Sequence, residues 1–204
     1  MALSAVGGPG TVWGGLLSAR VSEAMNAGES VPVNKFNTER LAVYDWTPTI
    51  EHQAQRFELE TALSGLLTAR VLEHLPPSLR THPGPDGIAR WIDARVAESD
   101  VLLIEQKDNG NLIGLMILSA DGEYGAGCKV HIGYLLAEAA WGQGIATELV
   151  AGFVAAMKPF KPVQVIGGVD KGNPSSARVL QKAGFVADVD NSHPDLVFYV
   201  QFIE

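Results

Sequence analysis

The chain has 204 residues, of which 47% are hydrophobic, which suits one domain with a sizeable core and an extension. Its 15 basic and 23 acidic residues give a formal net charge of −8, which argues against nucleic acid as the main partner. The only cysteine, Cys128, excludes an internal disulfide and a cysteine-rich metal site, and it fits a reducing cytoplasm. No apolar run approaches the length of a membrane span, and the N-terminus lacks the basic region of a signal peptide. We therefore expect a cytoplasmic protein that binds neither membranes nor nucleic acid and uses no metal.

The N-terminal part of the sequence differs in composition from the rest. Residues 1–33 are rich in Gly, Ala and Ser, which predicts a loosely attached extension. Apolar residues in the range 12–25 could make a short helix there. We expect the domain itself to occupy residues 34–204.

Short strands and helices are expected in the first half of this domain. The sequence over residues 38–43 predicts a first strand, and residues 49–75 predict a helical region whose broad apolar face includes Phe57. After a loop rich in Pro and Gly, residues 88–97 predict another helix, whose Trp91 we expect in the core.

A hairpin precedes the central part of the chain. Strands are expected over residues 101–107 and 112–118, because the intervening Asp108-Asn109-Gly110-Asn111 contains the Asn-Gly pair that favours tight hairpin turns.

A glycine-rich turn lies between a strand and a helix in the stretch from Lys129 to Met157. The strand is indicated by apolar residues that alternate up to Leu136, and the helix by apolar residues at helical spacing from Ile145. Small residues let the backbone approach a ligand, and the first N–H groups of a helix lack internal partners and lie at its positive end. Such a turn suits a pyrophosphate. The residues expected to form this site are Trp141, Gly142, Gln143, Gly144, Ile145, Ala146 and Thr147.

The sequence of this turn departs from two common phosphate-binding motifs. Gly142 and Gly144 match the start of a dinucleotide-binding motif, but Thr147 occupies its third glycine position. The stretch also lacks the Gly-Lys-Ser/Thr of a nucleoside-triphosphate loop. These two departures count against a nucleotide-binding protein, which we keep as an alternative.

A second patterned segment follows a buried strand expected over residues 163–169. That strand should lie parallel to the central one, joined to it by a right-handed helix crossover. Asn173 suits a helix cap, Pro174 the first helical position and Gly184 the position after the last turn. These features alone require no particular function. A last strand is expected over residues 196–202.

The two segments together carry a family resemblance. The patterns W-G-x-G-x-A-T-E, which follows I-G-Y-L-L, and N-x-x-S-x-R-V-L-x-K-x-G-F resemble the two acyl-CoA-binding motifs of the GCN5-related N-acetyltransferases (GNATs). Within that superfamily they are most similar to the branch that includes the ribosomal-protein N-terminal acetyltransferases, in which an opening like T-E-R-L at residues 38–41 is also common. The resemblance covers residues 36–202, and the two motifs stand in the expected order and spacing.

The resemblance implies a fold, a co-substrate and a set of contacts. The fold would be α/β (α+β), with a mixed, mostly antiparallel central sheet, two splayed parallel strands and flanking helices. Acetyl-CoA would bind with its pantetheine arm in the slot between the splayed strands. The acceptor would be a primary amine, either a protein N-terminus or a small amine, which an acidic chain suits. Beyond the turn itself, the implied acyl-CoA contacts are Leu135, Leu136, Asn173 and Ser176.

The chemistry of amine acetylation sets requirements for the site. About one lysine amine in 2500 is neutral at pH 7, against about a tenth or more of α-amines, so a lysine-like substrate has the greater need of a base. The thioester oxygen needs a hydrogen-bond donor for its developing charge. The resemblance places that donor in the backbone near Leu135 and Leu136, where a bulge would leave N–H groups unpaired.

Two positions depart from the family pattern. Many members protonate the departing thiolate with a tyrosine seven residues after the asparagine, where this chain has Leu180, although the resembled branch commonly lacks that tyrosine. Relatives often have Glu before I-G-Y, where this chain has His131. A histidine titrates near neutrality and can act as a base directly or through water, so His131 is the candidate base, with a purely structural role on the sheet as the alternative. We expect Tyr134 to pack in the sheet rather than act as an acid. Because of these departures, a non-catalytic acyl-CoA-binding or sensing module is the alternative to an N-acetyltransferase.

Overall fold

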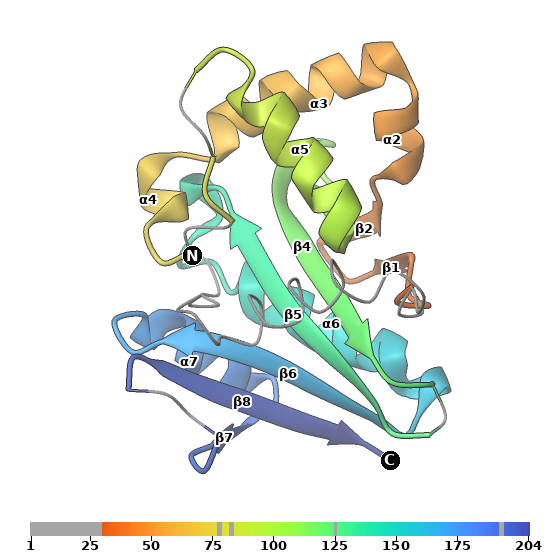
Figure 1. Cartoon of the computed structure of the whole chain (residues 1–204), viewed down its shortest axis with the longest axis vertical. Helices are drawn as coiled ribbons and strands as arrows, with labels where there is room; N and C mark the ends of the chain where they lie inside the picture. The colour runs from red at the N-terminus through yellow and green to blue at the C-terminus, as the bar shows by residue number, and fades with distance from the viewer. Residues whose placement is uncertain (1–29, 77–78, 82–83, 125, 192–193) are drawn as a thin grey trace.

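The computed structural model describes residues 30–76, 79–81, 84–124, 126–191 and 194–204. Within these ranges the chain forms one eight-stranded sheet with helices on both faces, as Figure 1 shows. The strand order is β1-β2-β3-β4-β5-β6-β8-β7, and every neighbouring pair is antiparallel except β5 and β6. The predicted fold class, a mixed and mostly antiparallel sheet with one parallel pair, is therefore confirmed.

The strands are β1 (Lys35–Asn37), β2 (Leu41–Asp45), β3 (Asp100–Gln106), β4 (Leu112–Asp121), β5 (Cys128–Leu136), β6 (Val163–Asp170), β7 (Val186–Asp188) and β8 (Leu196–Ile203). The α-helices are α2 (Thr47–Glu51), α3 (Gln53–Leu66), α4 (Ala69–Leu72), α5 (Gly87–Glu98), α6 (Ile145–Met157) and α7 (Pro174–Lys182). Short 3-10 helices, η2 (Glu138–Ala140) and η3 (Lys158–Phe160), stand before and after α6.

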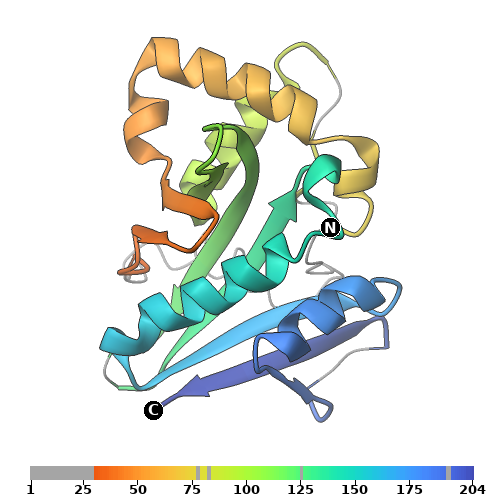
Figure 2. The same ribbon diagram turned by 180° about the vertical axis from the view of Figure 1, so that it is seen from behind.

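The helices divide into two layers that bury the two faces of the sheet. Helices α3, α4 and α5 lie over β3, β4 and the end of β5, whereas α6 and α7 lie side by side on the opposite face (Figures 1 and 2). Because successive strand residues point to opposite faces, β5 contributes to both layers. Ile132, Tyr134 and Leu136 pack toward α6, and Leu135 packs toward α3 and α5.

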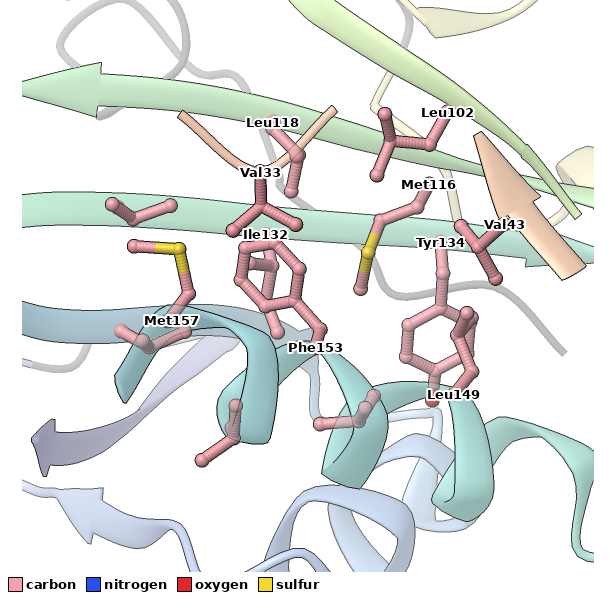
Figure 3. Packing of buried hydrophobic residues seen from close by; sticks show 14 of the residues in the cluster. Val33, Val43, Leu102, Met116, Leu118, Ile132, Tyr134, Leu149, Phe153 and Met157 are labelled. Carbon is pink, nitrogen blue, oxygen red and sulfur yellow. The ribbon is translucent and has the colours of Figure 1, made fainter. Parts of the chain in front are cut away.

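The core under α6 holds the glycine turn at a fixed place. Leu149, Phe153 and Met157 of α6 are fully buried against Ile132 and Tyr134 of β5, as Figure 3 shows. Burying one large apolar side chain stabilises a fold by about 1.5–3 kcal/mol. The start of α6 is therefore held against β5 by side chains along the whole length of the helix.

The second core lies under the helices of the first half. Trp91 of α5 is buried, makes an edge-to-face contact with Trp46 at 6.4 Å between ring centroids, and donates its indole N–H to the carbonyl of Leu79. The expectation that Trp91 belongs to the core is confirmed. In contrast, Phe57 is 70% exposed, so its predicted place on the buried face of the helix is wrong.

Several element boundaries differ from the sequence-based ones. The segment expected as a first strand contains a turn, because Thr38 N–H bonds to Leu41 O and joins β1 to β2 as a hairpin. The region expected as helical over residues 49–75 breaks at His52, which is extended, and again at Thr68, whose side chain caps α4. Strand β7 was not expected.

The first described residues already belong to the core. Val31 and Val33 are buried in the cluster under α6, although the sequence assigned them to the extension of residues 1–33. The helix considered for residues 12–25 lies outside the described residues. Among the described helices, none combines the length and the apolar character needed to cross a bilayer.

Candidate functional site

The two parallel strands pair over only part of their length. Their register runs from Cys128/Val163 to Ile132/Gly167, after which β5 continues to Leu136 along β4 and β6 continues along β8. Figure 1 shows the two strands diverging toward the end that carries α7. The predicted splay of the two parallel strands is therefore present, and we use the word slot for the interval between their diverging edges.

The inner edge of β5 presents backbone groups to this slot. Ala137 N–H bonds to Ile113 O of β4, and backbone groups alternate in direction along an antiparallel ladder. The N–H groups of Tyr134 and Leu136 therefore face the slot, whereas that of Leu135 faces β4. The register between β4 and β5 runs without a shift, so the bulge considered near Leu135 and Leu136 is not there, and the strand edge is left without a partner by the divergence of β5 and β6.

The glycine turn begins helix α6 in the geometry of an anion site. Gly142 and Gly144 have φ of +74° and +77°, the left-handed region that glycine adopts without a steric cost. Gly144 is the N-cap residue, and no side chain caps the helix. The first N–H groups of α6 thus have no side-chain cap, and they lie at the positive end of a helix of 13 residues, as in helix starts that bind anions.

A cavity of about 210 Å³ lies between the start of α6 and one face of α7. It brings together most of the residues that the sequence assigned to a pyrophosphate. Its lining consists of Leu136, Ala140, Trp141, Gly142, Gly144, Ile145, Ala146, Thr147, Ser175, Arg178, Val179 and Lys182. Gln143 of the same turn and Leu135 of β5 are not on this lining, and the side chain of Leu135 is buried in the core on the other face of the sheet.

Two positively charged residues line this cavity that were not predicted from the sequence as binding residues. Arg178 and Lys182 of α7 both line it. Their spacing of one helical turn places them on one face of α7, which is a signal that the sequence already contained. They give the cavity a positive side opposite the turn, although the chain as a whole is acidic.

Trp141 joins the turn to the strand and to α4. Its indole N–H donates to Leu136 O at 2.8 Å, and the guanidinium of Arg70 lies over its ring at 5.2 Å from the centroid. Arg70 and Thr68 also both contact the carboxylate of Glu138 in η2. The segment between β5 and α6 is therefore bound to α4, so the shape of the cavity wall depends on α4.

Helix α7, unlike α6, is capped at its start by a side chain, that of Asn173. Asn173 is buried, and its Oδ1 accepts the N–H of Ser176 at 3.1 Å. Ser176 is also buried, and the hydroxyl of Tyr134 lies beside it. Burial raises the pKa of Tyr134 above its ordinary value, and the contact with Ser176 offsets this only in part, so the phenol is neutral at pH 7.

Asn173→Ala is expected to have two separable effects. Loss of the cap should lower the free energy of unfolding by about 1 kcal/mol, as urea denaturation would measure. If Asn173 also contacts the pantetheine arm, the Michaelis constant for acetyl-CoA should rise. A change in stability alone would leave the cap as the complete role of this side chain.

His131 lies on the face of β5 away from α6. It is 7% exposed, pairs in register with Ser119 of β4, and is not on the lining of the cavity. Burial lowers the pKa of His131 to about 4; Asp121 opposes and Lys129 adds to this shift. The imidazole is therefore neutral at pH 7, which is the form that can accept a proton.

This pKa shift predicts a dependence of stability on pH. An unfolded chain would protonate His131 near its ordinary value of 6.5, but the folded chain only near 4. The unfolded state thus binds more protons in this window, so the free energy of unfolding should fall by up to about 3 kcal/mol as the pH drops from about 6.5 to about 4. Urea denaturation across that range should show a flatter dependence for His131→Gln. An equally steep pH dependence of the free energy of unfolding in His131→Gln would contradict the lowered pKa of His131.

No group of His, Cys, Asp and Glu residues in the described ranges is arranged to hold a metal ion.

Comparison with known proteins identifies the family to which the chain belongs. The family model described as "Acetyltransferase (GNAT) domain" matches residues 44–186, which is more than half of the chain. The chain belongs to the GNAT acetyltransferase family. A comparison with curated protein sequences gave no significant match.

Solved structures share the fold at low sequence identity. A GNAT-family acetyltransferase from Bacillus anthracis matches with a TM-score of 0.62 at 15% identity, over 82% of this chain and 98% of that one. A ribosomal-protein-S5-alanine acetyltransferase from Vibrio fischeri matches with a TM-score of 0.54 at 15% identity, over 83% and 97%. A putative acetyltransferase from Salmonella typhimurium, solved with its cofactor acetyl-CoA, matches with a TM-score of 0.53 at 13% identity, over 81% and 95%.

Proposed function

We propose that this protein transfers an acetyl group from acetyl-CoA to a primary amine by direct attack in a ternary complex. The observation that carries the proposal is the uncapped start of α6, which opens into a cavity beside the divergence of β5 and β6. An anion site next to a slot lined by strand edges matches the two parts of CoA, a pyrophosphate and an extended pantetheine arm. Membership of the GNAT family supports the same assignment.

Each part of the donor has a proposed place. The pyrophosphate would accept N–H groups of the turn from Gly142 to Thr147, with Arg178 and Lys182 adding opposite charge from α7. The pantetheine arm would extend between β5 and β6, near Asn173. The thioester oxygen would then lie at the N–H of Leu136, a donor fixed in direction before the reaction begins.

The acceptor we favour is an α-amine. Because the pKa of His131 is depressed to about 4, its neutral imidazole is a weak base. Because His131 stands five residues before Leu136 on the extended strand β5, the proton would reach it through intervening water. This transfer is less unfavourable from an α-ammonium, with a pKa of about 8, than from a lysine ammonium, with a pKa of about 10.4. One structural neighbour is a ribosomal-protein-S5-alanine acetyltransferase, which fits a protein N-terminus as the acceptor. Leu180 stands where many relatives have the acid for the thiolate, so we assign that step to no side chain.

Release of CoA from acetyl-CoA in the presence of different amines tests this function. We expect release with a peptide that has a free N-terminus, and much less with the same peptide when its N-terminus is blocked and only a lysine is free. A small amine forms the third arm. No release with any of these amines would contradict the enzymatic proposal.

A non-catalytic acyl-CoA-binding module is the second candidate. It is favoured by two observations, the leucine at position 180 and the low basicity of His131. Thermal stabilisation by CoA without any turnover would select it. Stabilisation by ATP or NAD instead of CoA would point to a nucleotide-binding protein and would contradict both candidates.

A further inference from the structure

We infer that Arg40 is a positioning residue for donor binding, which it supports by orienting the glycine turn and by neutralising Glu148 beside it. The inference rests on the proposed function, because it concerns the CoA site of that function. Arg40 belongs to the hairpin between β1 and β2 and is about a hundred residues away from the turn in sequence. It does not line the cavity itself.

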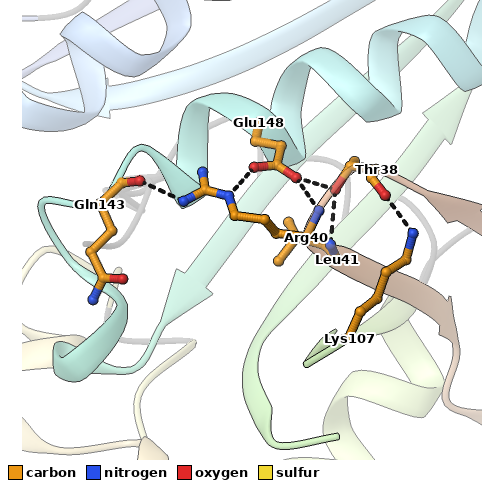
Figure 4. A network of polar contacts seen from close by, with 6 residues as sticks. All are labelled: Thr38, Arg40, Leu41, Lys107, Gln143 and Glu148. Atoms are coloured by element: carbon orange, nitrogen blue, oxygen red, sulfur yellow. Dashed lines mark hydrogen bonds and ion pairs between the residues drawn. The ribbon is translucent and has the colours of Figure 1, made fainter. Parts of the chain in front are cut away.

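The hairpin is packed directly on α6. A Cβ added at Gly152 of α6 would lie 2.5 Å from Cγ2 of Thr38, so the hairpin lies too close to α6 for a side chain at position 152. The ring of Phe36 in β1 also lies against Phe153 of α6, at 6.1 Å between centroids. The amine of Lys107 donates to Thr38 O and holds the hairpin from the side of β3 (Figure 4). Arg40 is therefore presented to the start of α6 from a fixed support.

Arg40 makes two kinds of contact with the start of α6, as Figure 4 shows. Its Nη1 donates to Gln143 O at 3.0 Å, and its Nε donates to Glu148 Oε2 at 2.6 Å. The backbone N–H of Arg40 donates to Glu148 Oε1 at 2.8 Å, and the hydroxyl of Thr38 donates to the same oxygen. One arginine thus binds a carbonyl of the turn and a carboxylate of the first helical turn.

The bond to Gln143 determines which backbone groups the turn presents. A phosphate is attracted by N–H groups and repelled by carbonyl oxygens, so the turn binds an anion only if its carbonyls point away. Gln143 lies between two glycines in the left-handed region, Gly142 and Gly144, where rotation of a peptide group meets little steric resistance. Arg40 holds the carbonyl of Gln143 on the hairpin side, away from the cavity.

The bond to Glu148 removes a charge that would oppose the ligand. Burial raises the pKa of Glu148, but hydrogen bonds from Thr38 and Arg40 outweigh burial and hold the pKa below its ordinary value, so the group is a carboxylate. A negative side chain in the first turn satisfies the helix dipole, yet it also repels a pyrophosphate at the same helix end. Pairing with Arg40 neutralises the carboxylate, so Glu148 can occupy the first turn of α6 without repelling a pyrophosphate there.

The test compares Arg40→Met, Glu148→Gln and the double variant in binding and in turnover. For Arg40→Met we expect the dissociation constant of CoA to rise about tenfold or more. This is the effect of losing hydrogen bonds between the misplaced N–H groups of the turn and the charged pyrophosphate. Glu148→Gln alone should not raise the constant, because the charge then left unpaired is the guanidinium of Arg40, which attracts the pyrophosphate rather than repelling it. The double variant should bind CoA more tightly than Arg40→Met, since it lacks the uncompensated carboxylate.

A truncated donor separates positioning from general damage to the fold. Acetyl-pantetheine carries the thioester but no pyrophosphate, so kcat/KM for this donor should be the same in Arg40→Met as in the unmodified protein. Arg56→Met is the matched control for CoA affinity, because Arg56 also pairs with two acidic side chains, Glu60 and Asp93, but on α3 and α5.

Two outcomes would overturn the inference. One is unchanged CoA affinity in a folded Arg40→Met variant, and the other is an equal loss of kcat/KM with acetyl-CoA and acetyl-pantetheine. Failure of the proposed function is distinguishable from either, because the unmodified protein would then either bind CoA without turnover or not bind CoA at all.

Discussion

Replacing Gly144 by valine should raise the dissociation constant of CoA by about a hundredfold or more, as losing two hydrogen bonds to a charged phosphate would. Gly144 has φ of +77°, which a β-branched residue adopts only at a cost of order 1–3 kcal/mol. The backbone would relieve this strain by rotating, which redirects the N–H groups at the start of α6. A Cβ at Gly144 would lie 3.7 Å from Nη2 of Arg40, so the added side chain would also disturb the arginine that holds Gln143 O. Isothermal titration with CoA measures the effect.

Gly110→Val is the matched control for this variant. Gly110 lies in the turn between β3 and β4 with φ of +70°, and a Cβ there meets nothing within 4 Å. Both variants therefore add similar backbone strain and should lower thermal stability by similar amounts. Gly110→Val should bind CoA like the unmodified protein. Unchanged CoA affinity in a folded Gly144→Val protein would remove the turn from the binding site.

Replacing His131 by alanine should lower the turnover number at pH 7 by about a hundredfold, if the imidazole accepts the proton of the attacking amine. CoA affinity should stay near that of the unmodified protein, because His131 is not on the lining of the cavity between α6 and α7. Because burial holds the pKa of His131 at about 4, the imidazole stays neutral from pH 6 to 9. Over that range the rate should rise only as the substrate amine loses its proton, and the deficit of the variant should shrink at high pH.

Cys128→Ala controls for disturbance of the same strand. Cys128 is a fully buried residue of β5 to which the proposed mechanism assigns no part, so this variant should turn over at the normal rate. Nearly full activity of His131→Ala at pH 7 would make the histidine structural. The base would then be water or the substrate's own equilibrium with its neutral form, which an α-amine tolerates better than a lysine.

Local patterns predicted the parts of the site that are contiguous in sequence. The glycine turn, the helix that follows it and the capped start of α7 each depend on residues within one or two helical turns, so their signals are visible in the sequence. The family motifs then placed these parts in one fold, including the parallel strand pair. Arg178 and Lys182 were within reach of the same reasoning, because their helical spacing places both on one face of α7.

Contacts between distant segments could not be predicted in this way. Nothing in the sequence around Arg40 indicates that it binds Gln143 and Glu148, because the hairpin meets α6 only through the packing of the whole sheet. The exposure of Phe57 was missed for a related reason. Helical spacing of apolar residues does not indicate that α3 begins anew after His52, so it does not indicate which of its residues face the sheet. The splay of β5 and β6 was expected, but whether the N–H groups near Leu136 are freed by a bulge or by the splay alone depends on the pairing of β5 with β4.

A crystal structure of the protein with acetyl-CoA tests the central claim most directly. The account predicts the pyrophosphate on the N–H groups from Gly142 to Thr147, the pantetheine arm between β5 and β6, and the thioester oxygen at the N–H of Leu136. Density for the nucleotide or the arm at any other place on the molecule would contradict it, as would a cavity between α6 and α7 that stays empty at saturating acetyl-CoA.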